Sequence, residues 1–173
     1  MTKKLSYEDA KTRVGKMAAK HGRPVDKHMG SLFAALMTKK LSYEEAKTRA
    51  DKMTDILGCP IDKNIKPLVI ALWMLGINTE ASCEGHLNSG CPYPWIDIAQ
   101  TSNQLAFFIL MSSPGKKGSD KTKSWVFHPM GGGKYFRITP WDVKRPLEEL
   151  QRDAISLAHY YRRLLSRILI RLQ

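Results

Sequence analysis

The sequence predicts a helix-rich α+β protein with a single core domain, a small mixed or antiparallel sheet and an N-terminal duplicated helical hairpin. Three observations lead to this prediction: an internal repeat with helical periodicity, short alternating segments after residue 94, and a long amphipathic helix at the C-terminal end. The chain has 173 residues, of which 43% are hydrophobic and 25% charged. These values are typical of one folded domain and leave little room for a second.

The internal repeat covers the first 72 residues. Residues 1–36 align with residues 37–72 without a gap and are identical at 21 of 36 positions. Each copy is predicted to form a helical hairpin, and Ser42 with Glu45 has the spacing of a capping box at the start of the second copy. We therefore expect residues 1–36 to be an extra hairpin and residues 37–173 to be the core domain. The apolar stripe of the extra hairpin must be covered, either by its own domain or by another subunit, and dimerisation through it is a hypothesis.

The second helix of the second copy is predicted to lie at the centre of the core. Residues 68–75 are apolar on nearly every side, which is typical of a buried helix. Pro67 suits the first turn, so the helix is expected to start near Lys66, and Gly76 is expected to end it. Asp62 lies where a side chain can cap this helix.

Short segments with strand patterns follow. Residues 95–99 and 135–139 alternate between apolar and polar side chains, and residues 125–127 form a third, shorter candidate. Residues 105–111 fit a strand or a buried helix, with the helix favoured, and residues 112–124 are predicted to be a loop.

The glycine run and the C-terminal segment complete the predicted fold. The run from Met130 to Lys134 lacks the spacing of a phosphate-binding loop, so we expect a hairpin turn there. The last segment begins at Pro146, which fits the first helical position, and apolar residues recur at helical spacing to Leu172.

The charge is unevenly distributed. The chain has a formal net charge of +12, yet residues 73–114 contain no lysine or arginine and carry only Glu80, Glu84 and Asp97. The basic flanks predict a polyanionic partner such as RNA, contacted through Lys116–Lys123 and through the face of the last helix that carries Arg163 and Arg167. A solvated basic shell is the alternative interpretation.

The composition also suggests a compartment. No apolar run is long enough to span a bilayer, the first residues lack a signal peptide pattern, and three cysteines do not make a disulfide framework. We expect a reduced, cytoplasmic protein without membrane contact.

The densest cluster of reactive side chains lies between Thr79 and His86. Cys83, Glu84 and His86 are the candidate catalytic residues: an imidazole can activate a neighbouring thiol, a carboxylate can act as a general base, and His86 can transfer a proton. The alternative is a buried strand with a small cysteine, in which His86 only satisfies a backbone carbonyl.

Further residues are expected to bind a ligand or cofactor around this cluster. Ser82 and the Gly85 backbone are expected to contact it together with Thr79, and Asp97 and His128 are expected to approach from neighbouring strands. Gly85 can take positive φ or let the backbone approach the ligand closely.

A metal site is an alternative use of the same segment. Cys83, His86 and Cys91 offer three ligands at a spacing of C-x2-H-x4-C, and His128 can supply a fourth, as tetrahedral zinc prefers.

Residues 61–70, the pattern Thr79-x-x-Ser82-Cys83-x-Gly85 and the segment 124–128 resemble the tRNA wybutosine-synthesising methyltransferase family. The resemblance implies S-adenosylmethionine as cofactor, bound at the serine-containing segment, and RNA as the substrate to be modified. The chain departs from the family pattern at Ala81, Glu84 and His86. The alternative function is a non-enzymatic basic adaptor for nucleic acid or protein, with a structural or zinc-bound cysteine and histidine cluster.

Overall fold

A computed structural model describes Thr12 and residues 41–54, 58–88, 90–99, 125–133 and 135–172, with side chains up to Ser166 in the last segment. The predicted extra hairpin of residues 1–36 (apart from Thr12), the predicted helix 105–111 and the predicted loop with Lys116–Lys123 lie outside these residues. So does the side chain of Arg167. The homodimer hypothesis therefore stays a prediction.

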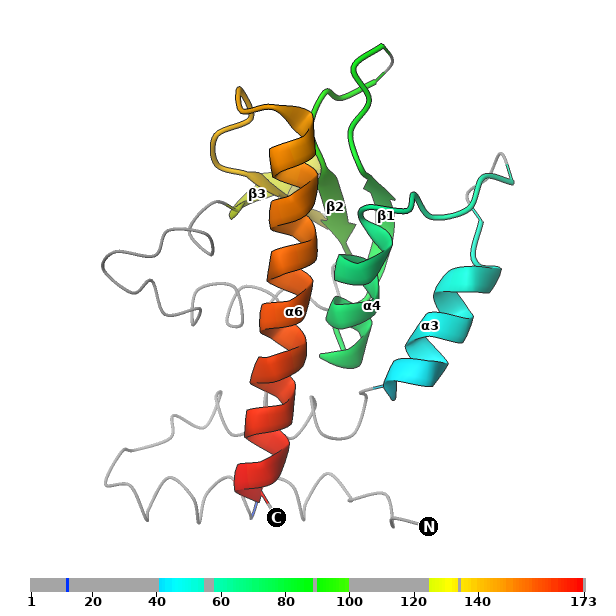
Figure 1. Cartoon of the computed structure of the whole chain (residues 1–173), viewed down its shortest axis with the longest axis vertical. Helices are drawn as coiled ribbons and strands as arrows, with labels where there is room; N and C mark the ends of the chain where they lie inside the picture. The colour runs from blue at the N-terminus through cyan, green and yellow to red at the C-terminus, as the bar shows by residue number, and fades with distance from the viewer. Residues whose placement is uncertain are drawn as a thin grey trace.

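The described elements form an α+β fold. In chain order they are α3 (Tyr43–Lys52), α4 (Lys66–Met74), β1 (Thr79–Cys83), β2 (Trp95–Ile98), β3 (Trp125–Met130), the 3-10 turn η3 (Gly131–Gly133), β4 (Tyr135–Pro140) and α6 (Leu147–Leu172). The sheet is antiparallel throughout, in the order β1-β2-β4-β3. Helix α4 packs between α3 and α6 (Figure 1).

The core lies between the helices and the sheet. Its largest fully buried side chains come from α4, from the sheet and from α6, and include Leu68, Leu72, Ile96, Ile138 and Tyr161. Burial on every side of α4 explains its nearly continuous apolar sequence, because the helix has few exposed positions where a polar residue would be favoured.

Several predicted boundaries are confirmed. Helix α3 begins with the complete capping box of Ser42 and Glu45, in which the Ser42 hydroxyl accepts from the Glu45 N–H and the Glu45 carboxylate accepts from the Ser42 N–H. Helix α4 starts at Lys66 with Pro67 in its first turn. Helix α6 starts at Leu147, one residue after the predicted position, and the Pro146 carbonyl accepts its first hydrogen bonds.

Two strands differ from the prediction. Residues 79–83 form β1, so the alternative of a strand that carries Cys83 is confirmed, although the strand is only partly buried. Strand β3 continues through His128 to Met130, and the hairpin turn comes at the glycines, where Gly131 and Gly132 have positive φ.

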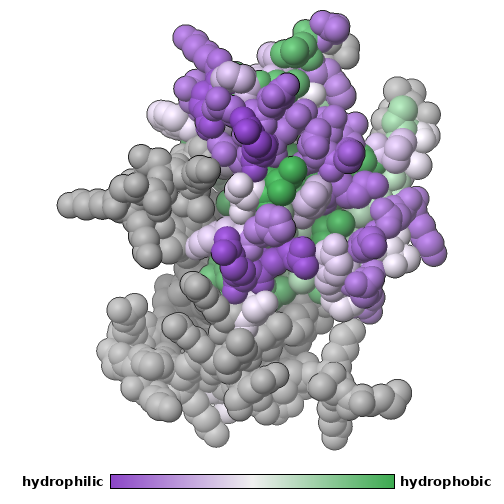
Figure 2. Space-filling model, in the orientation of Figure 1, coloured by the Kyte–Doolittle hydropathy of each residue, from purple (hydrophilic) through white to green (hydrophobic). Residues whose placement is uncertain are grey.

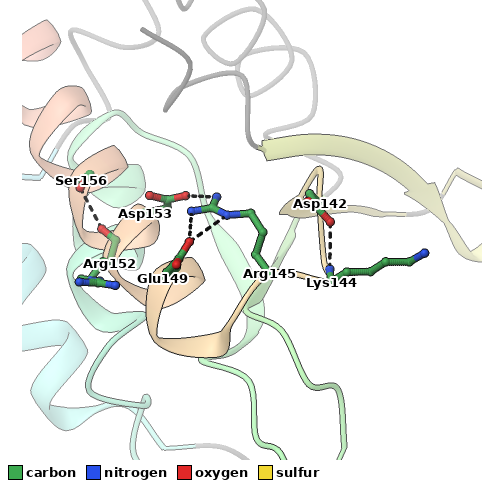
Figure 3. A network of polar contacts seen from close by, with 7 residues as sticks. All are labelled: Asp142, Lys144, Arg145, Glu149, Arg152, Asp153 and Ser156. Carbon is green, nitrogen blue, oxygen red and sulfur yellow. Dashed lines mark hydrogen bonds and ion pairs between the residues drawn. The ribbon is translucent and has the colours of Figure 1, made fainter.

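An arginine clamp fixes the start of α6 (Figure 3). Arg145 donates to the Asp153 carboxylate at 2.6 Å and to the Glu149 carboxylate at 2.9 Å. The hydrogen bonds to the two carboxylates raise the pKa of the Arg145 guanidinium, and the bond to Asp153 has the larger effect. Because both carboxylates lie on α6, the clamp ties the incoming chain to the first turns of the helix.

Candidate functional site

Two segments of the chain meet at one end of the helical layer, and each contributes to a cluster of side chains of the types that can hold a metal ion. Asp62 lies before α4, and Cys83 and His86 lie at the end of β1 and just beyond it. A carboxylate oxygen, the thiol sulfur and an imidazole nitrogen all lie within 4.8 Å of one another. The Asp62 Oδ2 atom is 3.5 Å from His86 Nε2. We refer to Asp62, Cys83 and His86 as the Asp-Cys-His cluster.

The chain reverses at Gly85, and this reversal places His86 beside Cys83. Gly85 has φ +85°, and a Cβ built there would lie 2.7 Å from Leu147 Cδ1 and 2.8 Å from the Tyr93 carbonyl carbon. The Gly85 N–H donates to Cys83 Sγ at 3.3 Å. The predicted positive φ is therefore confirmed, and the close approach of the backbone is to Leu147 and Tyr93.

Hydrogen bonds lock the two segments together. The Glu84 N–H donates to Asp62 Oδ2 at 3.1 Å, and the Asn64 N–H donates to Glu84 Oε2 at 2.7 Å. Gln151 of α6 connects to both segments, since its amide donates to the Glu84 carbonyl at 3.1 Å and accepts from the Asn64 amide at 3.2 Å. This network holds Asp62 and Cys83 in fixed relative positions.

The structure gives Glu84 and Asp62 roles different from those expected from sequence. The Glu84 carboxylate accepts from the backbone before α4, so it already has a structural partner where a general base was predicted. The prediction that Asp62 caps α4 is wrong, because no side chain caps this helix and the Asp62 carboxylate faces Glu84 and His86 instead.

The environment of Cys83 favours its protonated form. Burial raises the pKa of the thiol, and the negative charges of Asp62, Cys91 and Glu84 raise it further, while the hydrogen bond from Gly85 acts in the opposite direction. This result runs against the expected activation of the thiol by His86. A half-buried thiol among carboxylates is instead suited to a cation, which replaces the proton.

Two residues predicted to bind a ligand have partners in the protein. The Thr79 hydroxyl accepts from Trp73 Nε1 at 3.0 Å within the core. His128 forms a hydrogen bond of 3.1 Å with the Thr139 hydroxyl. Ser82 is half-buried and is paired with the core residue Ile96.

Asp97 belongs to an ion pair. Arg137 donates to both of its carboxylate oxygens, at 2.7 and 2.9 Å, and its guanidinium lies 3.9 Å from the centre of the Trp95 ring. The hydrogen bond to Asp97 is the main cause of a raised pKa for Arg137. The sequence did not identify this pair, because β2 and β4 are 40 residues apart in the chain at this point.

The four-residue zinc set predicted from spacing does not form. His128 lies on β3, at the opposite edge of the sheet from β1, which corresponds to about 14 Å across three strand spacings. Cys91 is closer, since its carbonyl accepts from the His86 N–H at 3.0 Å, but its sulfur is not part of the Asp-Cys-His cluster. The third donor beside Cys83 and His86 is Asp62, which was not among the predicted ligands.

Neither the protein-family models nor the curated proteins nor the solved structures compared with this chain match it. The resemblance to the wybutosine-synthesising methyltransferase family therefore stays a prediction. No helix in the described part of the chain is long and apolar enough to cross a bilayer.

Proposed function

We propose that this chain binds a zinc ion through Asp62, Cys83 and His86 and leaves one coordination position for water or an exogenous ligand. The observation that carries the proposal is the close approach of the three donor atoms, all within 4.8 Å of one another. Donors around a tetrahedral zinc ion are separated by about 3.3–3.8 Å, so adjustments of about 1 Å suffice to close the site.

The donor set favours zinc over the common hard cations. Thiolate and imidazole are borderline or soft ligands, which zinc accepts readily and which magnesium and calcium avoid. Asp62 and a deprotonated Cys83 together neutralise a divalent ion. His86 is about half exposed, so an ion has access from solvent.

Three protein ligands with one open position are typical of catalytic zinc, whereas structural zinc usually has four protein ligands. The ion would polarise a bound water or a ligand oxygen at the end of β1. The Glu84 N–H, which donates to Asp62 Oδ2, would hold this ligand in position, as outer partners do in metal sites generally, and Gln151 in turn donates to the Glu84 carbonyl.

Zinc binding is tested on the full chain by competition with a chromophoric chelator and by elemental analysis after dialysis. We expect one zinc per chain, lost in Cys83→Ser and His86→Ala and retained in the matched controls Cys59→Ser and His128→Ala. Cobalt substitution should produce a sulfur-to-cobalt charge-transfer band that disappears in Cys83→Ser. Substoichiometric zinc in the wild-type chain, or equal binding by all four variants, would overturn the proposal.

S-adenosylmethionine-dependent RNA modification is tested in the same samples. The carboxylates of Asp62 and Glu84 near Cys83 suit a sulfonium cation, so the cofactor is included in a thermal-shift series with and without zinc. A rise in melting temperature with S-adenosylmethionine but none with zinc would favour that function over the metal site.

A further inference from the structure

A hollow lined mainly by cationic side chains lies between α3, the start of α4 and α6. It has a volume of about 220 Å³, and its lining includes Lys47, Lys63, Lys66 and Arg162. Among the described residues that line it, Asp51 is the one carboxylate, and it pairs with Lys66 at 3.4 Å. The lining therefore keeps a net positive charge.

The floor of the hollow is apolar and partly aromatic. Pro67, Ile70 and Ala158 line it together with Tyr43, and the Arg162 guanidinium lies 4.3 Å from the centre of the Tyr43 ring. This stacking holds the guanidinium in place before any ligand arrives.

A second hollow continues the first along α6. It shares His159 and Arg162 with the first and adds Arg163 and Ser166, with a volume of about 650 Å³. The helix rises about 1.5 Å per residue, so the stretch from Ser156 to Ser166 extends about 15 Å. Figure 2 shows hydrophilic side chains with small apolar areas between them on this face of the molecule. We refer to the two hollows together as the basic groove.

We propose that the basic groove binds single-stranded nucleic acid, with the cations on the phosphates and the apolar floor under the sugars and bases. A positively charged groove with aromatic surface is the usual design of proteins that bind single strands. The two hollows are lined by α6 residues from Ser156 to Ser166, which suits a polymer, and the bases of a duplex are paired with each other and cannot lie on the apolar floor. The basic groove shares no residue with the Asp-Cys-His cluster, although its Lys63 directly follows Asp62 in the chain, and this proposal does not depend on zinc.

The proposal is tested by fluorescence anisotropy with a labelled single-stranded uridine-rich RNA of 20 nucleotides and a duplex of the same length. The groove variant combines Lys47→Gln, Lys63→Gln and Arg163→Gln. The control variant combines Lys52→Gln, Lys144→Gln and Arg152→Gln, exposed cations outside the basic groove. Both triple variants remove the same net charge, and their urea transitions report whether each is folded.

We expect the groove variant to lose at least about tenfold in affinity at about 0.1 M salt, and its salt slope to fall by about 2 for three lost phosphate contacts. The control variant should stay within about threefold of the wild type, and a chelator should leave binding unchanged. Equal losses in both variants would overturn the proposal, as would a duplex that binds as tightly as the single strand. Competition by polyglutamate as strong as that by RNA would also overturn it and indicate an acidic protein segment.

Discussion

The Asp62 carboxylate accepts a hydrogen bond from the backbone N–H of Glu84 at 3.1 Å, across 22 residues of sequence. The same Oδ2 atom lies 3.5 Å from His86 Nε2. One carboxylate thus joins the loop before α4 to the end of β1 and completes the Asp-Cys-His cluster. Helix α4 and strand β1 lie between Asp62 and Cys83 in the chain, and the turn between these two elements returns the chain to Asp62.

In the chain freed of metal by a chelator, we expect the thiol of Cys83 to react more slowly with iodoacetamide than the exposed thiol of Cys59 at pH 7–8. Alkylation requires the thiolate, and burial with nearby negative charge raises the pKa of Cys83. Mass spectrometry of timed samples measures both rates. Faster reaction of Cys83 would support the activation by His86 expected from sequence.

The same pKa shift predicts how stability changes with pH. The unfolded chain releases the Cys83 proton more readily than the folded chain, because the folded pKa is the higher one. This contribution to stability is therefore complete below the ordinary thiol pKa and is lost as pH rises through the raised value. For the metal-free chain, urea unfolding from pH 7 to 10 should show a smaller decline in stability for Cys83→Ser than for the wild type.

Gly85→Ala should destabilise the fold by about 2–4 kcal/mol, because the new methyl group meets Leu147 and the Tyr93 backbone in addition to the cost of positive φ. Gly58→Ala is the matched control, since Gly58 also has positive φ but nothing lies within 4 Å of the place that its Cβ would take. We expect it to cost about 1–2 kcal/mol. Urea denaturation measures both, and equal losses would contradict the close packing at Gly85.

Glu84→Ala should cost about 1–3 kcal/mol, because the Asn64 N–H loses a charged acceptor. Glu84→Gln should restore most of this loss, since the amide oxygen can accept the same bond. A structural role predicts that zinc affinity follows the stability of the loop in the two variants. Loss of zinc binding in a Glu84→Gln variant of full stability would instead indicate that the negative charge of Glu84 itself is needed.

Asp97→Ala should destabilise the protein by about 2–4 kcal/mol, because it leaves the half-buried Arg137 guanidinium without its bidentate partner. A double-mutant cycle with Arg137→Ala isolates the coupling between the two residues. Zinc stoichiometry should not change, since this pair is separate from the Asp-Cys-His cluster. Additive losses in the cycle would contradict the pair.

Local patterns were sufficient to predict many elements. The capping box at Ser42, the start of α4 at Lys66 and the apolar face of α6 follow from short-range rules, in which a residue acts on neighbours three or four positions away. Strand β1 was predicted only as the alternative for its segment, because its polar side chains do not show the alternation typical of a strand. The backbone hydrogen bonds to β2, rather than a pattern of apolar side chains, make this segment a strand.

The sequence by itself predicted the fold class and most helix boundaries, and it singled out the segment with Cys83 and His86, two of the three residues of the Asp-Cys-His cluster. Only the tertiary structure decided that Asp62 joins them, that Asp97 pairs with Arg137, and that His128 lies at the far edge of the sheet. The physical reason is the distance along the chain over which each interaction acts. Helix caps and apolar periodicity act within a few residues, whereas a binding site depends on the order of the strands and on the packing of helices between them.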